Sequence, residues 1–223
     1  MGKEIEIMES VYDRNEKLAQ ETNDMLTKKK VFAINVLGAP GTGKTTCLIN
    51  IIPNLTSKSY VIEGDIESDI DTQILKSSGI DAIQINTGGA CHLDSPLIAE
   101  ALNKIDLKEG ILFIENIGNL VCPAEFLIGE HIKMLILDVT GGSDKPYKYP
   151  LAFEKADIIL LNKEDLIEYV DFDLEMFKEA FLKLNKDVPI FLVSGKDGSG
   201  FMEVADWLEE KREKVINGST LKE

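Results

Sequence analysis

The segment from residue 38 to residue 46, Gly-Ala-Pro-Gly-Thr-Gly-Lys-Thr-Thr, has the residue types and spacing of a phosphate-binding loop. Glycines in such a loop let backbone N–H groups surround phosphate oxygens, the lysine reaches the β- and γ-phosphates, and the next hydroxyl binds Mg²⁺. The alternative is a ligand-free glycine-rich turn, but the apolar run before the loop and the helical pattern after it favour nucleotide binding. The predicted nucleotide-binding residues of this loop are Gly38, Gly41, Thr42, Gly43, Lys44, Thr45 and Thr46.

A second motif, Asn-Lys-Glu-Asp at residues 162–165, indicates which base the nucleotide carries. A carboxylate at Asp165 can accept hydrogen bonds from both N1–H and the exocyclic amine of guanine, whereas adenine lacks this pair of donors. Each hydrogen bond to a charged group contributes about 1.5–3 kcal/mol, which is enough to select GTP over ATP. Alone, the motif also fits a solvated helix start; downstream of a phosphate loop it predicts guanine binding. The predicted base-binding residues are Asn162, Lys163, Asp165, Ser194, Gly195 and Lys196.

Acidic residues follow two further apolar segments. Glu115 ends the run 111–115, where a water-bridged Mg²⁺ ligand belongs, and Gly118 comes soon after it with an N–H that could meet a γ-phosphate. Asp65 and Asp69 lie in an acidic cluster that fits either a solvated turn or a group that positions Mg²⁺ or the attacking water. The predicted catalytic residues are Lys44, Asp65 and Glu115, and the predicted Mg²⁺ ligands are Thr45, Asp65 and Glu115.

Two cysteines and a histidine form a possible transition-metal site. Cys91 and His92 are adjacent, and Cys122 follows another strand of the predicted parallel sheet, so the three side chains could meet in space. Thiolates and imidazole suit Zn²⁺ or Ni²⁺. Spacing alone favours another interpretation, in which the two cysteines are small buried residues and His92 starts a helix. Cys47 is expected in the core, and His131 is expected to be structural rather than a ligand.

Strand and helix patterns alternate from residue 31 onward and predict an α/β fold, a three-layer sandwich around a mainly parallel sheet of about seven strands. The expected strands are 31–37, 59–63, 81–86, 111–115, 132–139, 157–162 and 189–193. The expected helices are 44–55, 69–78, 94–105, 148–155, 173–185 and 200–215. Around them we expect three parts: an N-terminal helical segment at 1–30, a GTPase domain at 31–216 and a C-terminal tail at 217–223.

Composition limits the classes of partner. The net charge of −15 and the absence of a basic cluster argue against nucleic acid, because polyphosphate binding needs clustered Lys and Arg. No apolar run is long enough to span a membrane, and the first residues lack the apolar core of a signal peptide. Three cysteines do not describe a disulfide framework. We therefore expect no nucleic acid, no membrane and a cytoplasmic location.

Together these motifs resemble the HypB family of hydrogenase nickel-incorporation GTPases. The resemblance covers residues 30 to 215, and its most specific part is the run Glu-Asn-Ile-Gly-Asn-Leu-Val-Cys-Pro at 115–123. It implies hydrolysis of GTP to GDP and phosphate, coupled to nickel insertion into [NiFe]-hydrogenase. It also implies nickel or zinc at Cys91, His92 and Cys122, and a homodimer stabilised by GTP and metal. The implied partners are nickel donor or acceptor accessory proteins and the hydrogenase large subunit.

Other functions stay open at this stage. The similar urease-type nickel accessory GTPases typically carry Cys-Pro-His, which this sequence lacks, and Pro96 stands where a further histidine ligand could have been. A small-molecule kinase would share the phosphate loop but would carry an Arg-rich lid. A metal-binding scaffold could bind nucleotide without turnover, and measured GTP hydrolysis would separate that scaffold from a GTPase.

Overall fold

The computed structural model describes residues 2–65, 70–216 and 218, and the side chains of the first helix from Tyr12 onward. Seven strands form one sheet in the order β3-β2-β4-β1-β5-β6-β7, and every pair is parallel. The strands are β1 Val31–Leu37, β2 Ser59–Asp65, β3 Ala82–Asn86, β4 Gly110–Glu115, β5 Ile132–Asp138, β6 Ile158–Asn162 and β7 Ile190–Leu192. The predicted fold class is thereby confirmed.

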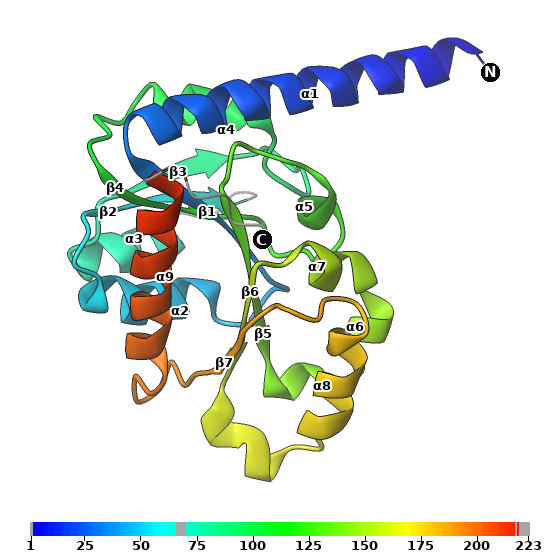
Figure 1. The fold of residues 1–223 in the computed structure, drawn as a ribbon, viewed down its shortest axis with the longest axis vertical. Helices are drawn as coiled ribbons and strands as arrows, with labels where there is room; N and C mark the ends of the chain where they lie inside the picture. The colour runs from blue at the N-terminus through cyan, green and yellow to red at the C-terminus, as the bar shows by residue number, and fades with distance from the viewer. Residues whose placement is uncertain (1, 66–69, 217, 219–223) are drawn as a thin grey trace.

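Helices cover both faces of this sheet and complete the three layers (Figure 1). The α-helices are α1 Gly2–Lys28, α2 Lys44–Ile51, α3 Ile70–Ser77, α4 Ser95–Leu102, α5 Cys122–Glu125, α6 Lys145–Lys148, α7 Pro150–Lys155, α8 Leu174–Leu182 and α9 Phe201–Ile216. The part of the chain that the structure describes also contains short 3₁₀-helices, namely η1 Ile52–Asn54, η2 Val139–Gly141 and η3 Glu164–Tyr169.

Each face of the sheet packs against its own set of helices. Phe32, Ile34 and Val36 of β1 join the core shared with α2, α3 and α9. Val31 and Ala33, which alternate with them, face the core under α1 and α4, and a third cluster lies under α5, α7 and α8. Such alternation is what a strand buried on both sides requires, because successive side chains point to opposite faces.

Helix ends differ from the predicted ranges where proline or a capping residue decides them. The helix predicted at 44–55 ends at Ile51 and continues as η1, which contains Pro53 near its start. The helix predicted at 148–155 begins at Pro150 as α7, and a separate short helix, α6, precedes it and ends at Lys148. Asp173 caps α8 as expected, because its carboxylate accepts a hydrogen bond from the Met176 N–H.

The segment predicted as an N-terminal helix forms α1, which packs on the sheet domain through buried residues that include Ala19 and Leu26. Of the predicted tail 217–223, only Gly218 is among the described residues. No helix in the described part of the chain is long and apolar enough to span a bilayer. All strands run in one direction, so their carboxyl ends lie at the same side of the sheet, which is called its carboxyl edge. The loops after β1, β2, β3, β4, β6 and β7 lie at this edge.

Candidate nucleotide and metal sites

The loop after β1 wraps the start of α2 and opens onto a cavity of about 220 Å³. Gly41 and Gly43 adopt positive φ angles of 78° and 86°, which side chains with a Cβ rarely adopt. The cavity lies at the N-terminus of α2, and the free N–H groups of a helix N-terminus favour an anion. The cavity is lined by Gly41, Gly43, Lys44, Thr45, Thr46, Ile49, Asp71, Ile74 and Glu115.

Glu115 and Thr45 form the part of this cavity that fits a divalent cation. The Thr45 hydroxyl donates to Glu115 Oε1 at 3.0 Å, and Glu115 Oε2 is buried with no hydrogen-bond partner among the described residues. Burial raises the pKa of Glu115 to about 7, although the charge of Lys44 and the Thr45 hydrogen bond oppose this shift. An unpartnered buried carboxylate oxygen beside a hydroxyl is a suitable donor set for Mg²⁺.

Two aspartates lie near Glu115. The negative charges of Asp71 and Asp65 both raise the pKa of Glu115, and Asp71 of α3 also lines the cavity. Sequence reasoning missed Asp71 and selected Asp65 and Asp69 instead. Asp69 lies outside the described residues. The signal for Asp71 was its place in the first turn of the helix after the acidic cluster.

The predicted base-binding loops are tied to the phosphate loop. Asn162 donates from Nδ2 to the Thr42 carbonyl at 2.9 Å and accepts from the Gly195 N–H at 3.1 Å. Lys163 extends from a left-handed backbone position, and its Nζ donates to the Gly41 carbonyl at 2.8 Å. The arrangement brings the end of β6 and the loop after β7 against the phosphate loop, as the sequence predicted for Asn162.

Asp165 lies in η3, directly after β6, and has polar neighbours. The Ser194 hydroxyl donates to Asp165 Oδ1 at 3.0 Å, and Lys196 Nζ lies 3.7 Å from Asp165 Oδ2. The side chain is only partly exposed, so a base that pairs with this carboxylate would be held in a fixed orientation. The geometry thus joins Asp165, Ser194 and Lys196 in one place, as the motif requires.

The loop after β4 packs directly against the phosphate loop. A Cβ added at Gly118 would stand 2.8 Å from Pro40 Cγ and 3.0 Å from Pro40 N, so only glycine fits there without displacing the loop. One residue later, Asn119 forms an antiparallel bridge with Gly38. The predicted γ-phosphate contact at Gly118 therefore lies against the predicted phosphate loop.

Cys91, His92 and Cys122 come together at the same edge of the sheet. Their candidate ligand atoms all lie within 4.8 Å of one another, with Cys91 Sγ 3.3 Å from Cys122 Sγ and 3.5 Å from His92 Nδ1. The hydrogen bond from the Cys91 thiol to Cys122, together with partial burial, raises the pKa of Cys91. Burial lowers the pKa of His92. The interpretation of both cysteines as buried core residues is wrong, because Cys91 is exposed and Cys122 half-buried.

The remaining cysteine and histidine lie elsewhere. Cys47 is fully buried in the core, and burial raises its pKa strongly. His131 accepts from the Ala33 N–H through Nδ1 and shares a hydrogen bond with the Thr27 hydroxyl through Nε2. Burial lowers the pKa of His131 to about 4. With both ring nitrogens engaged, His131 has the structural position that the sequence suggested.

A parallel sheet whose first strand leads through Gly-x-x-x-x-Gly-Lys-Thr into a helix defines a P-loop nucleotide-binding protein. The chain belongs to the family CobW/HypB/UreG, nucleotide-binding domain, whose model matches residues 32–192. This finding confirms the resemblance that the motifs indicated.

Relatives and solved structures agree with this membership. Hydrogenase maturation factor HypB of Azotobacter vinelandii is 41% identical over 211 residues, which are 93% of this chain and 70% of that protein. Hydrogenase/urease maturation factor HypB of Helicobacter hepaticus is 37% identical, over 94% of this chain and 89% of that protein. The crystal structure of HypB from Helicobacter pylori in complex with nickel superposes with a TM-score of 0.86 at 35% identity, covering 90% of this chain and 96% of that one.

Proposed function

We propose that this protein is a GTPase that couples GTP binding and hydrolysis to nickel insertion during [NiFe]-hydrogenase maturation. The observation that carries the proposal is the position of the Cys91–His92–Cys122 cluster beside the loop that leaves Glu115. Only a few residues separate the predicted nucleotide contacts at Glu115 and Gly118 from Cys122. The names of the relatives, and the structure of one relative in complex with nickel, support the choice of metal and pathway.

The nucleotide half of the site suits phosphoryl transfer to water. Lys44 brings a positive charge to the β- and γ-phosphates, where negative charge grows in the transition state. Thr45 and Glu115 would hold Mg²⁺, which supplies further positive charge at those phosphates. Asp65 and Asp71, whose charges act on Glu115, are the candidates for orienting the attacking water. Guanine would be selected by Asn162, Lys163 and Asp165.

The cluster suits a metal that must be released again. Two thiolates and one imidazole are ligands for Ni²⁺ and Zn²⁺ alike, and three ligands leave coordination positions open for an acceptor or a second subunit. A homodimer that brings two such clusters together would fill those positions, since two-fold contacts pair like surfaces. The acceptors that follow from this function are nickel accessory proteins and the hydrogenase large subunit. Urease maturation is a second candidate, because Helicobacter relatives are named for both pathways.

Two measurements test the proposed function, one for GTP hydrolysis and one for nickel insertion. The purified protein should hydrolyse GTP in the presence of Mg²⁺, and ATP should be a far poorer substrate. Deletion of the gene should make hydrogenase activity, or urease activity for the second candidate, depend on added nickel. A protein that binds GTP without releasing phosphate would be the non-hydrolysing scaffold instead.

We expect Asp165→Asn to weaken GTP binding about tenfold to a hundredfold, because the amide turns an N–H toward the guanine donors. The same variant should gain affinity for the xanthine nucleotide, whose O2 accepts that N–H. Titration with both nucleotides measures the change. Glu164→Gln, which neutralises the neighbouring carboxylate, is the matched control and should leave both affinities unchanged. Equal affinity of the native protein for GTP and ATP would contradict guanine selection.

The raised pKa of Glu115 predicts that the effect of Mg²⁺ on GTP affinity depends on pH. Below about 7 the buried carboxyl is protonated, so Mg²⁺ must displace that proton. The Mg²⁺-dependent gain in affinity should therefore grow by up to ~tenfold per pH unit and level off above pH 7. Glu115→Gln should abolish this dependence. Glu63→Gln removes a neighbouring carboxyl whose pKa burial also raises to about 7, and it should only move the profile to lower pH.

A further inference from the structure

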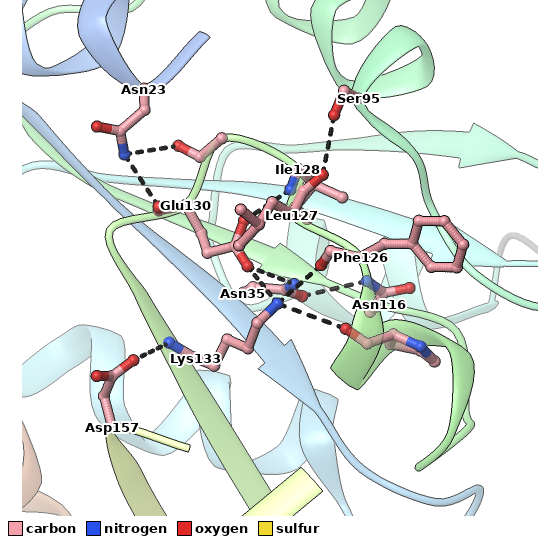
Figure 2. A network of polar contacts seen from close by, with 12 residues as sticks. Asn23, Asn35, Ser95, Asn116, Phe126, Leu127, Ile128, Glu130, Lys133 and Asp157 are labelled. Atoms are coloured by element: carbon pink, nitrogen blue, oxygen red, sulfur yellow. Dashed lines mark hydrogen bonds and ion pairs between the residues drawn. The ribbon is translucent and has the colours of Figure 1, made fainter. Parts of the chain in front are cut away.

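Lys133 and Glu130 form a buried ion pair within a network of polar contacts (Figure 2). Lys133 lies within β5, a strand that is buried along its whole length, and Glu130 precedes this strand. The side chains are 7% and 3% exposed, respectively. Removing two charges from water costs several kcal/mol per ion unless geometry and further hydrogen bonds compensate. A position inside a buried strand would be filled more simply by an apolar residue.

Lys133 holds the segment that carries Cys122. Its Nζ donates to the Phe126 carbonyl at 2.8 Å and to the Pro123 carbonyl at 3.5 Å, as well as to Glu130. A lysine ammonium has three donors, and all three are used here. Pro123 directly follows Cys122, so the lysine fixes both ends of α5.

Phe126 also links this segment to the histidine of the cluster. Its ring stacks on the His92 ring with a centroid distance of 4.3 Å and on the Tyr12 ring of α1 at 5.2 Å. The neighbouring carbonyl of Leu127 accepts from Asn15 of α1 at 2.9 Å. The ring against which His92 rests is therefore fixed from both sides, by Lys133 and by α1.

The other end of the network holds the segment that carries Cys91 and His92. Asn35 Nδ2 donates to Glu130 Oε1 at 3.3 Å, and Asn116 Nδ2 donates to Asn35 Oδ1 at 3.1 Å. Asn116 Oδ1 then accepts from the Leu93 N–H at 3.0 Å, one residue after His92. The four side chains of this continuous chain, the polar brace, are Asn35, Asn116, Glu130 and Lys133.

We propose that the polar brace positions the two metal-binding segments relative to each other, so that the ligand atoms of Cys91, His92 and Cys122 are held at metal-binding distances. The proposal rests on the function proposed above. It accounts for the charges, because a buried ion pair adds little to stability over well-packed apolar residues but can fix a unique arrangement. It also accounts for the targets of the brace, which are backbone groups next to ligands: the Pro123 carbonyl and the Leu93 N–H. These four side chains are positioning residues, not ligands.

The test replaces the ion pair without leaving a lone buried charge. The double variant Glu130→Gln with Lys133→Met should lose Ni²⁺ affinity by tenfold or more and should change the thiolate-to-nickel charge-transfer spectrum. GTP affinity and the thermal unfolding midpoint without metal should stay close to native values. The matched control is Glu100→Gln with Lys104→Met, an ion pair of the same chemistry with both side chains about two-thirds exposed. That control should leave the nickel affinity and the spectrum unchanged.

A milder variant guards against misfolding of the double variant. Asn35→Ala interrupts the brace between its two ends and leaves the ion pair intact, so we expect this variant to fold. It should lower Ni²⁺ affinity about fivefold or more, because it removes two hydrogen bonds of the brace, the one to Glu130 and the one from Asn116. Native nickel affinity in the folded Asn35→Ala variant, together with native affinity in the folded double variant, would overturn the proposal.

A second probe separates the brace from the nickel function. Phenylarsine oxide forms two arsenic–sulfur bonds with a close pair of thiols, and its oxygen leaves with the two thiol protons as water. Cys91 and Cys122 should bind it in the native protein, whereas Cys47 is buried. The double variant should bind it at least tenfold more weakly. If the native protein binds nickel only weakly, but the double variant still binds the arsenical more weakly than the native protein does, the proposed function is rejected and the brace is retained. Unchanged arsenical binding in the double variant would reject the brace.

Discussion

Lys44→Ala should lower kcat for GTP hydrolysis by about a hundredfold to a thousandfold, or ~2.7–4 kcal/mol, while the protein stays folded. Lys44 is the first residue of α2, and its side chain lines the phosphate cavity instead of packing in the core. Its charge already acts on this site, because it lowers the pKa of Glu115 against the effect of burial. This loss of activity should exceed the loss caused by removing any single side chain that contacts the base, because Lys44 acts on the phosphates, where negative charge grows in the transition state.

Single-turnover hydrolysis with saturating Mg²⁺ and GTP measures the loss in the chemical step apart from binding. Lys186→Ala is the matched control: this exposed lysine lies in the loop before β7, at the opposite edge of the sheet from the site. Circular dichroism and unfolding midpoints should be native for both variants. Normal turnover in the folded Lys44→Ala protein would show that the loop binds phosphate without contributing to catalysis.

The elements that position the site could be predicted because their signals are local. Each of the seven predicted strands is present, and the loop that joins β1 to α2 falls where the glycine spacing placed it. The link from Asn162 to the phosphate loop could also be predicted, because parallel strands bring their carboxyl ends to one edge. The short helix at Cys122 was missed, since four residues carry no periodic pattern.

Contacts that depend on tertiary placement could not be predicted. Asp71 was overlooked because its entry into the phosphate cavity depends on how α3 packs, not on spacing from Asp65. Lys133 lies inside a predicted apolar strand, and no pattern indicates which carbonyls its ammonium reaches. Spacing alone favoured core positions for the two cysteines for the same reason, because a separation in sequence does not say whether two loops meet; only the family resemblance indicated a metal site.

We expect Cys122→Ala to lower Ni²⁺ affinity by a hundredfold or more and to remove the effect of the nucleotide on that affinity. The thiol is one of three candidate ligands, so its loss leaves a two-ligand site. Cys47→Ala also removes one thiol but leaves the cluster intact, which makes it the matched control. Affinity should be measured with GDP and with a non-hydrolysable GTP analogue. In the native protein it should fall with decreasing pH, because thiolate and neutral imidazole are the forms that bind metal.

The expected effect of the nucleotide follows from the loop between the two sites. Asn119 bridges to Gly38 of the phosphate loop, donates from Nδ2 to the Cys91 carbonyl at 3.3 Å, and accepts from the Val121 N–H at 2.9 Å. A shift at the phosphate loop therefore reaches both cysteines through one residue. If the dimer that GTP favours binds metal more tightly than the monomer, because two clusters then face each other, metal must in turn favour that dimer, since linkage is reciprocal. Nickel should then raise the dimer fraction measured by sedimentation with the GTP analogue but not with GDP. The same dimer fraction in both nucleotide states, or unchanged nickel affinity in Cys122→Ala, would show that the two sites are independent.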